Sequence, residues 1–278
     1  MRTVRLPDGT EVTALGQGTW KMGQDQRPRG EEAAALRLGL DLGMTLIDTA
    51  EMYGDGGAEE VVGDAIAGRR AEAFIVSKVY PHNASRRGTV AACERSLKRL
   101  RIERIDLYLL HWRGTVPLAE TVAAFEGLRQ AGKIGAWGVS NLDASEMDEL
   151  LGVPGGTACA TDQVLYNPSA RAIEFDLLGW SAAHAVPLMA YSPVGQGGRL
   201  LHAPALASVA RRHGATAAQV AIAWAMRHPG VIAIPKASDA AHVRQNAAAA
   251  ELALTEADVS AIDAAFPPPR HKRPLAML

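Results

Sequence analysis

The sequence of 278 residues has only two cysteines, no long apolar run and no excess of either charge. Cys93 and Cys159 stand outside any Cys-x-x-Cys or metal-ligand spacing, so we expect two buried thiols in a reducing cytoplasm and no disulfide. Lys and Arg number 29 against 30 Asp and Glu, which leaves a net charge of −1. This balance argues against binding to nucleic acid or to an anionic membrane surface.

Signals for membrane insertion and for metal binding are also missing. Apolar runs stay well below the roughly 20 residues that a membrane-spanning helix needs. The first residues, MRTVRLPDGTEV, lack the apolar core of a signal peptide and predict a strand, a turn and a second strand. The eight histidines are scattered, without an HExxH motif or a His/Cys grouping, so we expect no metal site.

Short apolar stretches alternate with helical patterns along almost the whole chain. The stretches that predict strands are 15–20, 45–50, 74–79, 105–111, 134–141, 159–167, 187–193 and 231–235. Two of the stripes with helical spacing between them are Val90, Cys93, Leu97 and Leu100, and Leu118, Val122, Phe125 and Leu128.

This alternation predicts an α/β fold, a (β/α)8 TIM barrel in a single domain that spans residues 1–278. A short N-terminal β-hairpin at 3–13, turning at PDGT, is expected to cover the bottom of the barrel. An open doubly wound sheet is the alternative. Helix starts are marked by capping-box spacings at Asp143 with Glu146 and at Thr216 with Gln219.

Polar residues gather at the C-terminal ends of the predicted strands. They are Asp48, Lys78, His111, Ser140, Asn141, Gln163, Tyr191, Ser192 and Lys236. In a parallel barrel these ends share one mouth, where active sites lie. Residues far apart in the chain are therefore expected to meet over one pocket.

Asp48, Lys78 and His111, together with Tyr53, suggest proton-transfer chemistry. Burying four such groups is costly unless they serve a purpose, which favours a functional role over capping or core packing. A Lys ammonium beside a phenol lowers the phenol pKa from about 10. Tyr53 could then protonate a carbonyl oxygen, to which His111 hydrogen-bonds, while hydride arrives at the carbon. Because no side chain supplies hydride, a redox cofactor is required.

The chain closely resembles the aldo-keto reductase superfamily in eight ordered segments: LGQGTW, LIDTAEMYG, FIVSKV, LLHW, GVSN, TDQVLYN, AYSP and IPKAS. The resemblance implies that Asp48, Tyr53, Lys78 and His111 form a catalytic tetrad. It also implies NADPH, bound without the GxGxxG fingerprint, which this sequence lacks. The implied cofactor contacts are Gly18, Thr19, Trp20, Asp48, Ser140, Asn141, Gln163, Tyr191, Ser192, Pro193, Val194, Gly195, Pro235, Lys236, Ala237, Ser238, His242, Gln245 and Asn246.

Within that set, the resemblance implies separate parts for the cofactor's two ends. Ser140, Asn141 and Gln163 should hydrogen-bond the carboxamide, and Tyr191 should stack under the nicotinamide ring. The stretch 192–198, SPVGQGG, should wrap the pyrophosphate, because its glycines let backbone N–H groups approach the phosphates.

The adenosine end departs from the family pattern at one position. Lys236 matches the site for the 2′-phosphate, which favours NADPH. Six residues later, where many relatives have Arg, this chain has His242, and Arg244 follows two positions on. Gln245 and Asn246 match the adenine end. Because of Lys236 we expect NADPH to be the first cofactor. Because a bidentate Arg is missing, we also expect some use of NADH.

The substrate is less clearly indicated. Trp20, Tyr80 and Trp112 should line the mouth with Tyr53 and His111, and a short tail after 266 predicts a broad, open site. Segments such as GQGTWKMG and SKVYPHNA resemble bacterial reductases of methylglyoxal and related dicarbonyls. The resemblance implies reduction of small aldehydes and dicarbonyls to alcohols. Because many relatives are monomers, it also implies a monomer rather than an oligomer.

Two other functions stay open from the sequence. One is a Schiff-base aldolase with Lys78 as nucleophile, which would leave Lys236 and the amide side chains without a role. The other is a sensor or partner protein that binds NADPH with little turnover.

Overall fold

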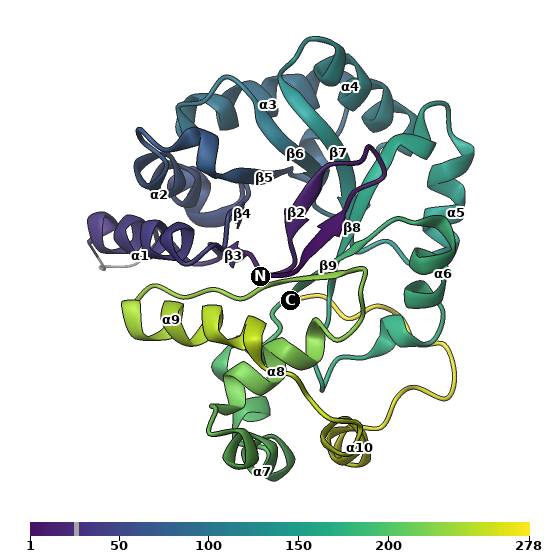
Figure 1. Cartoon of the computed structure of the whole chain (residues 1–278). Helices are drawn as coiled ribbons and strands as arrows, with labels where there is room; N and C mark the ends of the chain where they lie inside the picture. The colour runs from purple at the N-terminus through teal and green to yellow at the C-terminus, as the bar shows by residue number, and fades with distance from the viewer. Residues whose placement is uncertain (25–27) are drawn as a thin grey trace.

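The structure is a computed structural model that describes residues 1–24 and 28–278. In these residues eight parallel strands form a barrel surrounded by helices (Figure 1). The strands are β3 (Gln17–Gly18), β4 (Leu46–Asp48), β5 (Phe74–Val79), β6 (Ile105–Leu110), β7 (Ile134–Ser140), β8 (Cys159–Leu165), β9 (Leu188–Tyr191) and β10 (Val231–Ile234). Each predicted stretch contains one of them, which confirms the (β/α)8 barrel.

The barrel closes where β3 meets β10. The Gly16 N–H donates to the carbonyl oxygen of Ala233 over 2.8 Å, and the Gly18 N–H donates to that of Pro235 over 3.0 Å. A Cβ atom added to Gly18 would lie 2.8 Å from the carbonyl oxygen of Ile234. Glycine at position 18 therefore serves the close approach of two strands, which an open sheet would not need.

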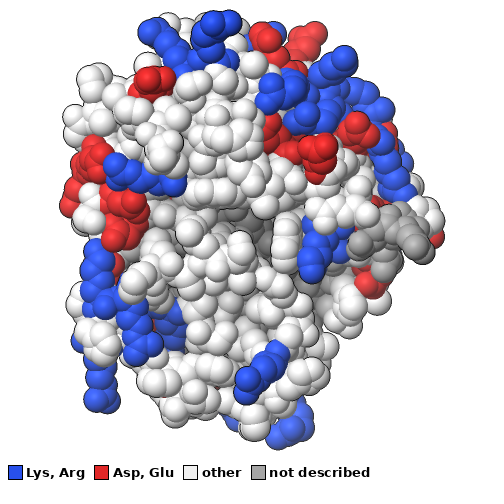
Figure 2. Space-filling view, turned by 180° about the vertical axis from the view of Figure 1, so that it is seen from behind, with Lys and Arg blue, Asp and Glu red and all other residues white. Residues whose placement is uncertain are grey.

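The predicted N-terminal hairpin is confirmed. Strands β1 (Thr3–Arg5) and β2 (Glu11–Thr13) pair antiparallel in front of the barrel in Figure 1. Val4, Leu6 and Val12 are buried in one cluster with side chains from the barrel strands. The hairpin thus plugs one end of the barrel, whereas the opposite face, shown in Figure 2, is hollowed at its centre.

The helices cover the outside of the barrel. They are α1 (Arg29–Asp41), α2 (Gly57–Ala65), α3 (Arg86–Leu100), α4 (Leu118–Gln130), α5 (Ala144–Gly152), α6 (Leu177–His184), α7 (Pro204–His213), α8 (Ala217–Ala225), α9 (Ala240–Ala248) and α10 (Glu256–Ala265). Both predicted capping boxes form, at the starts of α5 and α8. The prediction for Val90 was wrong: it is exposed, because the buried stripe of α3 begins at Thr89.

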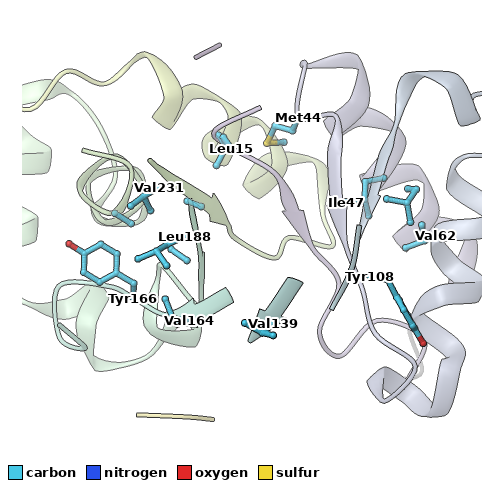
Figure 3. Packing of buried hydrophobic residues seen from close by; sticks show 14 of the residues in the cluster. Leu15, Met44, Ile47, Val62, Tyr108, Val139, Val164, Tyr166, Leu188 and Val231 are labelled. Atoms are coloured by element: carbon cyan, nitrogen blue, oxygen red, sulfur yellow. The ribbon is translucent and has the colours of Figure 1, made fainter. Parts of the chain in front are cut away.

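Alternation along the strands separates two buried layers. Ile47 points outward and packs beside Val62 of α2 (Figure 3), whereas Leu46 belongs to the barrel interior. Because side chains alternate along a strand, Asp48 points inward like Leu46. On β5, Val76 points inward, and Lys78, two residues later, therefore points inward too. The sheet geometry therefore aims these polar side chains at the centre of the barrel.

Two predictions about buried and apolar segments can be compared with the structure. Cys93 and Cys159 are both free and buried, which confirms the prediction of two buried thiols. Within residues 1–24 and 28–278, no helix has both the length and the apolar character that crossing a membrane requires.

Candidate active site

A cavity of about 740 Å³ lies at the C-terminal ends of the strands, on the face opposite the hairpin. The hollow in Figure 2 is surrounded mostly by uncharged residues. The sequence-predicted residues that line the cavity are Gly18, Thr19, Trp20, Asp48, Tyr53, His111, Trp112, Ser140, Asn141, Gln163, Tyr191, Ser192, Pro193, Val194, Lys236, His242, Gln245 and Asn246. The structure therefore brings side chains from all parts of the chain to one place.

Some predicted residues lie outside this wall. Lys78 is fully buried beneath it, and Gly195, Pro235, Ala237 and Ser238 are neighbours of wall residues. Tyr80, predicted to line the mouth, packs its ring against Trp112 with 5.0 Å between centroids. Tyr80 thus contacts a wall residue without being part of the wall itself.

The wall also contains residues that the sequence prediction missed: Lys21, Met52, Leu201, Thr216, Ala217, Ala218, Ile234, Met277 and Leu278. Lys21 and Met52 adjoin predicted site residues and could have been found by extending the motifs. No sequence signal marks Met277 and Leu278, because only the folded chain shows that the tail returns to the cavity.

At the floor of the cavity, the ammonium group of Lys78 is shared by Asp48, Thr49 and Tyr53. Lys78 Nζ lies 2.8 Å from each carboxylate oxygen of Asp48 and 2.8 Å from the carbonyl oxygen of Thr49. It lies 3.4 Å from the hydroxyl oxygen of Tyr53. Asp48 also accepts a hydrogen bond of 2.7 Å from Gln163 Nε2. Since the phenol oxygen accepts from Lys78, the proton of the phenol is left for an acceptor in the cavity.

The electrostatics of Tyr53 differ from the sequence-based expectation. Burial raises the pKa of Tyr53 well above about 10, and the negative charge of Asp48 acts in the same direction. The expected net fall of this pKa was wrong, because Asp48 balances the ammonium charge of Lys78 and the loss of water then outweighs what attraction remains. Burial also lowers the pKa of Lys78, which the carboxylate of Asp48 opposes.

His111 completes the group beside the phenol. Its ring stands edge-on to that of Tyr53, with 5.6 Å between centroids. Burial lowers the pKa of His111 well below its usual value, and the charge of Lys78 adds to the effect. Among the described residues its Nδ1 atom has no hydrogen-bond partner. A neutral imidazole at this place can donate one hydrogen bond into the cavity and carries no charge of its own.

Asn141 connects three strand ends on the other side of the cavity. Its Nδ2 donates to the carbonyl oxygen of His111 over 3.2 Å and to Ser140 Oγ over 2.9 Å. Its Oδ1 accepts from the Tyr191 hydroxyl over 2.9 Å. These bonds hold an amide group and an aromatic ring next to each other at the wall.

A cationic group lies at the far rim. Lys236 Nζ donates to Ser238 Oγ over 3.0 Å. His242, in the first turn of α9, lies with Nδ1 2.6 Å from the carboxylate of Asp239, which caps that helix. The rim thus combines one ammonium and one imidazole with an acidic neighbour.

Comparison with known proteins matches residues 14–266 to the Aldo/keto reductase family. Methylglyoxal reductase YeaE of Escherichia coli is 51% identical over 281 residues, covering 100% of this chain and 99% of the relative. Glyoxal reductase of Bacillus subtilis is 35% identical, covering 94% and 92%. An aldo-keto reductase from Klebsiella pneumoniae, crystallised in complex with NADPH, superimposes with a TM-score of 0.97 at 50% identity, covering 100% and 99%.

Proposed function

Because the chain belongs to the aldo/keto reductase family, we propose that it reduces small aldehydes and dicarbonyls, such as methylglyoxal, to alcohols with NADPH. The observation that carries the proposal is the buried group on the cavity floor, where Lys78 Nζ lies between Asp48 and the hydroxyl of Tyr53. Relatives named for methylglyoxal and glyoxal reduction support the substrate class.

In the proposed reaction Tyr53 protonates the carbonyl oxygen. Its raised pKa keeps the phenol protonated at neutral pH, so the proton donor is loaded before the substrate arrives. As the proton leaves, negative charge develops on the phenol oxygen at 3.4 Å from Lys78 Nζ. The ammonium, itself fully buried, stabilises this charge, and neutral His111 hydrogen-bonds the substrate oxygen.

The residues of the cavity fit NADPH. Asn141 and Gln163 offer amide groups for a carboxamide, and Tyr191 offers an aromatic face beside them. At the rim, Lys236 offers an ammonium and His242 an imidazole for a phosphate. NADPH, when bound, supplies the hydride for the carbonyl carbon. The residues of the wall hold the cofactor and keep the carbonyl oxygen of the substrate next to the hydroxyl of Tyr53.

Cofactor preference depends on the rim. His242 can form fewer bonds to a phosphate than a forked guanidinium, and the carboxylate of Asp239 lies beside it. Lys236 supplies the remaining attraction for the 2′-phosphate. We therefore expect NADPH to be preferred and NADH to be used measurably.

The cavity wall favours small substrates. Trp20, Met52 and Trp112 are apolar wall residues near the phenol, and Met277 with Leu278 adds a wall from the tail. The sequence predicted a broad, open site with a short tail, and in the structure the end of that tail forms part of the cavity wall. A compact dicarbonyl can enter with its carbonyl oxygen aimed at Tyr53.

The experiment is a measurement of NADPH consumption by the purified protein with methylglyoxal, glyoxal, phenylglyoxal and nitrobenzaldehydes, repeated with NADH. We expect turnover with the dicarbonyls and higher kcat/KM with NADPH. Tight NADPH binding without turnover of any carbonyl would indicate a sensor instead. Trapping of a covalent adduct on Lys78 by borohydride would indicate an aldolase, although the burial of this ammonium between Asp48 and Tyr53 disfavours one.

A further inference from the structure

Asp162, on β8 next to Gln163, is a buried carboxyl group that the proposed reaction does not use. Gln163 lines the cavity, whereas Asp162 is 0% exposed behind it. In the described part of the chain, its Oδ2 atom has no hydrogen-bond partner. Burial raises the pKa of Asp162 well above its usual value, and the acidic groups of Glu146 and Asp143 add to this, while backbone N–H groups oppose it. The side chain is thus a buried carboxyl group with a raised pKa and, within the described residues, one unpaired oxygen.

The position of Asp162 results from an irregularity in the sheet. Trp137 of β7 pairs with Cys159 of β8, but Val139 pairs with Asp162, so β8 contains one extra residue here. Such a bulge changes the direction of the side chains that follow it. It lets Gln163 face the cavity while Asp162 faces the turn between β7 and α5.

Asp162 holds that turn through a backbone group. The N–H of Leu142 donates to Asp162 Oδ1 over 3.5 Å, and Leu142 is itself 0% exposed. The preceding N–H, of Asn141, donates to the carbonyl oxygen of Gln163 over 2.9 Å. Two successive N–H groups of the turn are therefore bound by β8. Without Asp162, the second would be a buried donor that lacks this acceptor.

The geometry of the turn determines where Asn141 points. Asn141 has a φ of 63°, in the left-handed region that Asn tolerates better than most residues. From this conformation its side chain contacts the carbonyl oxygen of His111, Ser140 Oγ and the Tyr191 hydroxyl. A change in the backbone at 141–142 would break these contacts together.

We propose that Asp162 is a positioning residue that, by binding the Leu142 N–H, holds Asn141 in the orientation in which it meets the carboxamide of the cofactor. This inference rests on the proposed function for what Asn141 touches. An Asn side chain at position 162 has nearly the same shape and also offers an oxygen acceptor, so it should keep the bond to the Leu142 N–H. A Leu side chain has no acceptor and should not.

The test is the dissociation constant of NADPH, measured by fluorescence titration without substrate. We expect Asp162→Asn to remain within about twofold of the parent protein and Asp162→Leu to bind NADPH about tenfold more weakly, the effect of one lost buried hydrogen bond. Asn141→Ala should also weaken binding. In the Asn141→Ala background, Asp162→Leu should have no further effect, because its influence passes through Asn141.

Thr161→Val is the matched control on the same strand. It removes a buried hydrogen bond of 2.7 Å to the carbonyl oxygen of Pro187, so it should lower the melting temperature and leave the NADPH dissociation constant unchanged. If Asp162→Leu does not fold, Asp162→Ala takes its place in the same cycle. Equal affinity of parent and Asp162→Leu, or additive losses in the double variant, would overturn the inference. Absence of NADPH binding by the parent protein would instead overturn the proposed function.

Discussion

At the scale of single residues, one ammonium group shared by a carboxylate and a phenol determines the chemistry of the site. Lys78 is 0% exposed and balances the charge of Asp48, which leaves Tyr53 a weak acid with its proton in place. Proton transfer then depends on the acceptor: only when negative charge develops on the substrate oxygen does the phenol become a useful donor. The site therefore holds its proton until the reaction takes place.

Replacing Tyr53 by Phe tests this role. The substitution keeps the ring beside His111 and removes only the hydroxyl, so the fold and the cofactor site should be preserved. We expect kcat for dicarbonyl reduction to fall at least about 100-fold, the usual effect of losing a general acid. NADPH affinity should stay within about twofold. Steady-state kinetics and fluorescence titration measure the two quantities, and retained turnover would mean that another group supplies the proton.

The pH profile of kcat tests the two pKa directions. The pKa of Tyr53 is raised, so the acid form persists through neutral pH, and that of His111 is lowered, so the imidazole stays neutral down to acidic pH. Both shifts move the titration of these groups away from neutral pH. We expect kcat with saturating substrate and NADPH to be flat between about pH 6 and pH 8. A single inflection near pH 6.5 that disappears in His111→Asn would contradict the lowered pKa.

At the scale of elements, the C-terminal tail acts as an additional loop of the active site. After α10 the chain returns to the barrel, and the C-terminus lies near the barrel centre in Figure 1. Lys272 Nζ lies 3.1 Å from Asp143, the N-cap of α5, and 3.2 Å from Asp176, just before α6. These ion pairs are partly exposed and contribute little to stability. They attach the tail to α5 and to the residue before α6, and five residues further on Met277 lines the cavity.

Deleting Met277 and Leu278 tests the tail. The deletion removes two apolar wall residues and leaves the cavity floor intact. We expect the ratio of kcat/KM for bulky aromatic aldehydes to that for methylglyoxal to rise about tenfold, a change typical of enlarging an apolar pocket. Lys272→Met, which removes only the anchor, should change the ratio in the same direction by less. An unchanged ratio in the deletion variant would show that the tail does not select substrates.

At the scale of the whole molecule, closure of the barrel brings together the two sides of the cavity. Strand β3 has only two residues, and the barrel closes beside it through two isolated bridges, Leu15 with Ala233 and Gly18 with Lys236. Gly18 and Lys236 form one of these bridges, so the closure itself places the cationic rim next to the first strand. Loss of closure would therefore separate the two sides of the cavity as well as expose the core.

Gly18→Ala tests the closure. The added methyl group would lie 2.8 Å from a backbone oxygen that cannot easily move, so we expect the free energy of unfolding to fall by at least about 2 kcal/mol. Gly127→Ala is the control, since Gly127 lies inside α4 with open space around its added Cβ and should gain up to about 1 kcal/mol. Chemical denaturation measures both. Equal stability of Gly18→Ala and the parent would show that the strands can separate at no cost.

The sequence by itself determined the barrel, the hairpin and the identities of most wall residues. Strand positions follow from local apolar runs, and the ends of parallel strands share one mouth, so the meeting of Asp48 with Gln163 could be inferred without coordinates. Capping boxes such as that of Asp143 were likewise predictable, because a cap depends on residues only three positions apart.

Only the tertiary structure decided the properties that depend on surroundings. The pKa of Tyr53 follows from its burial and from the balance between Lys78 and Asp48, which no spacing in the chain specifies. The ring of Tyr80 packs against Trp112 outside the cavity wall, and the last residue, Leu278, reaches the cavity although the sequence marks it only as a tail. Local interactions can be read along a chain, but solvent exclusion and long-range packing arise only when distant segments have come together.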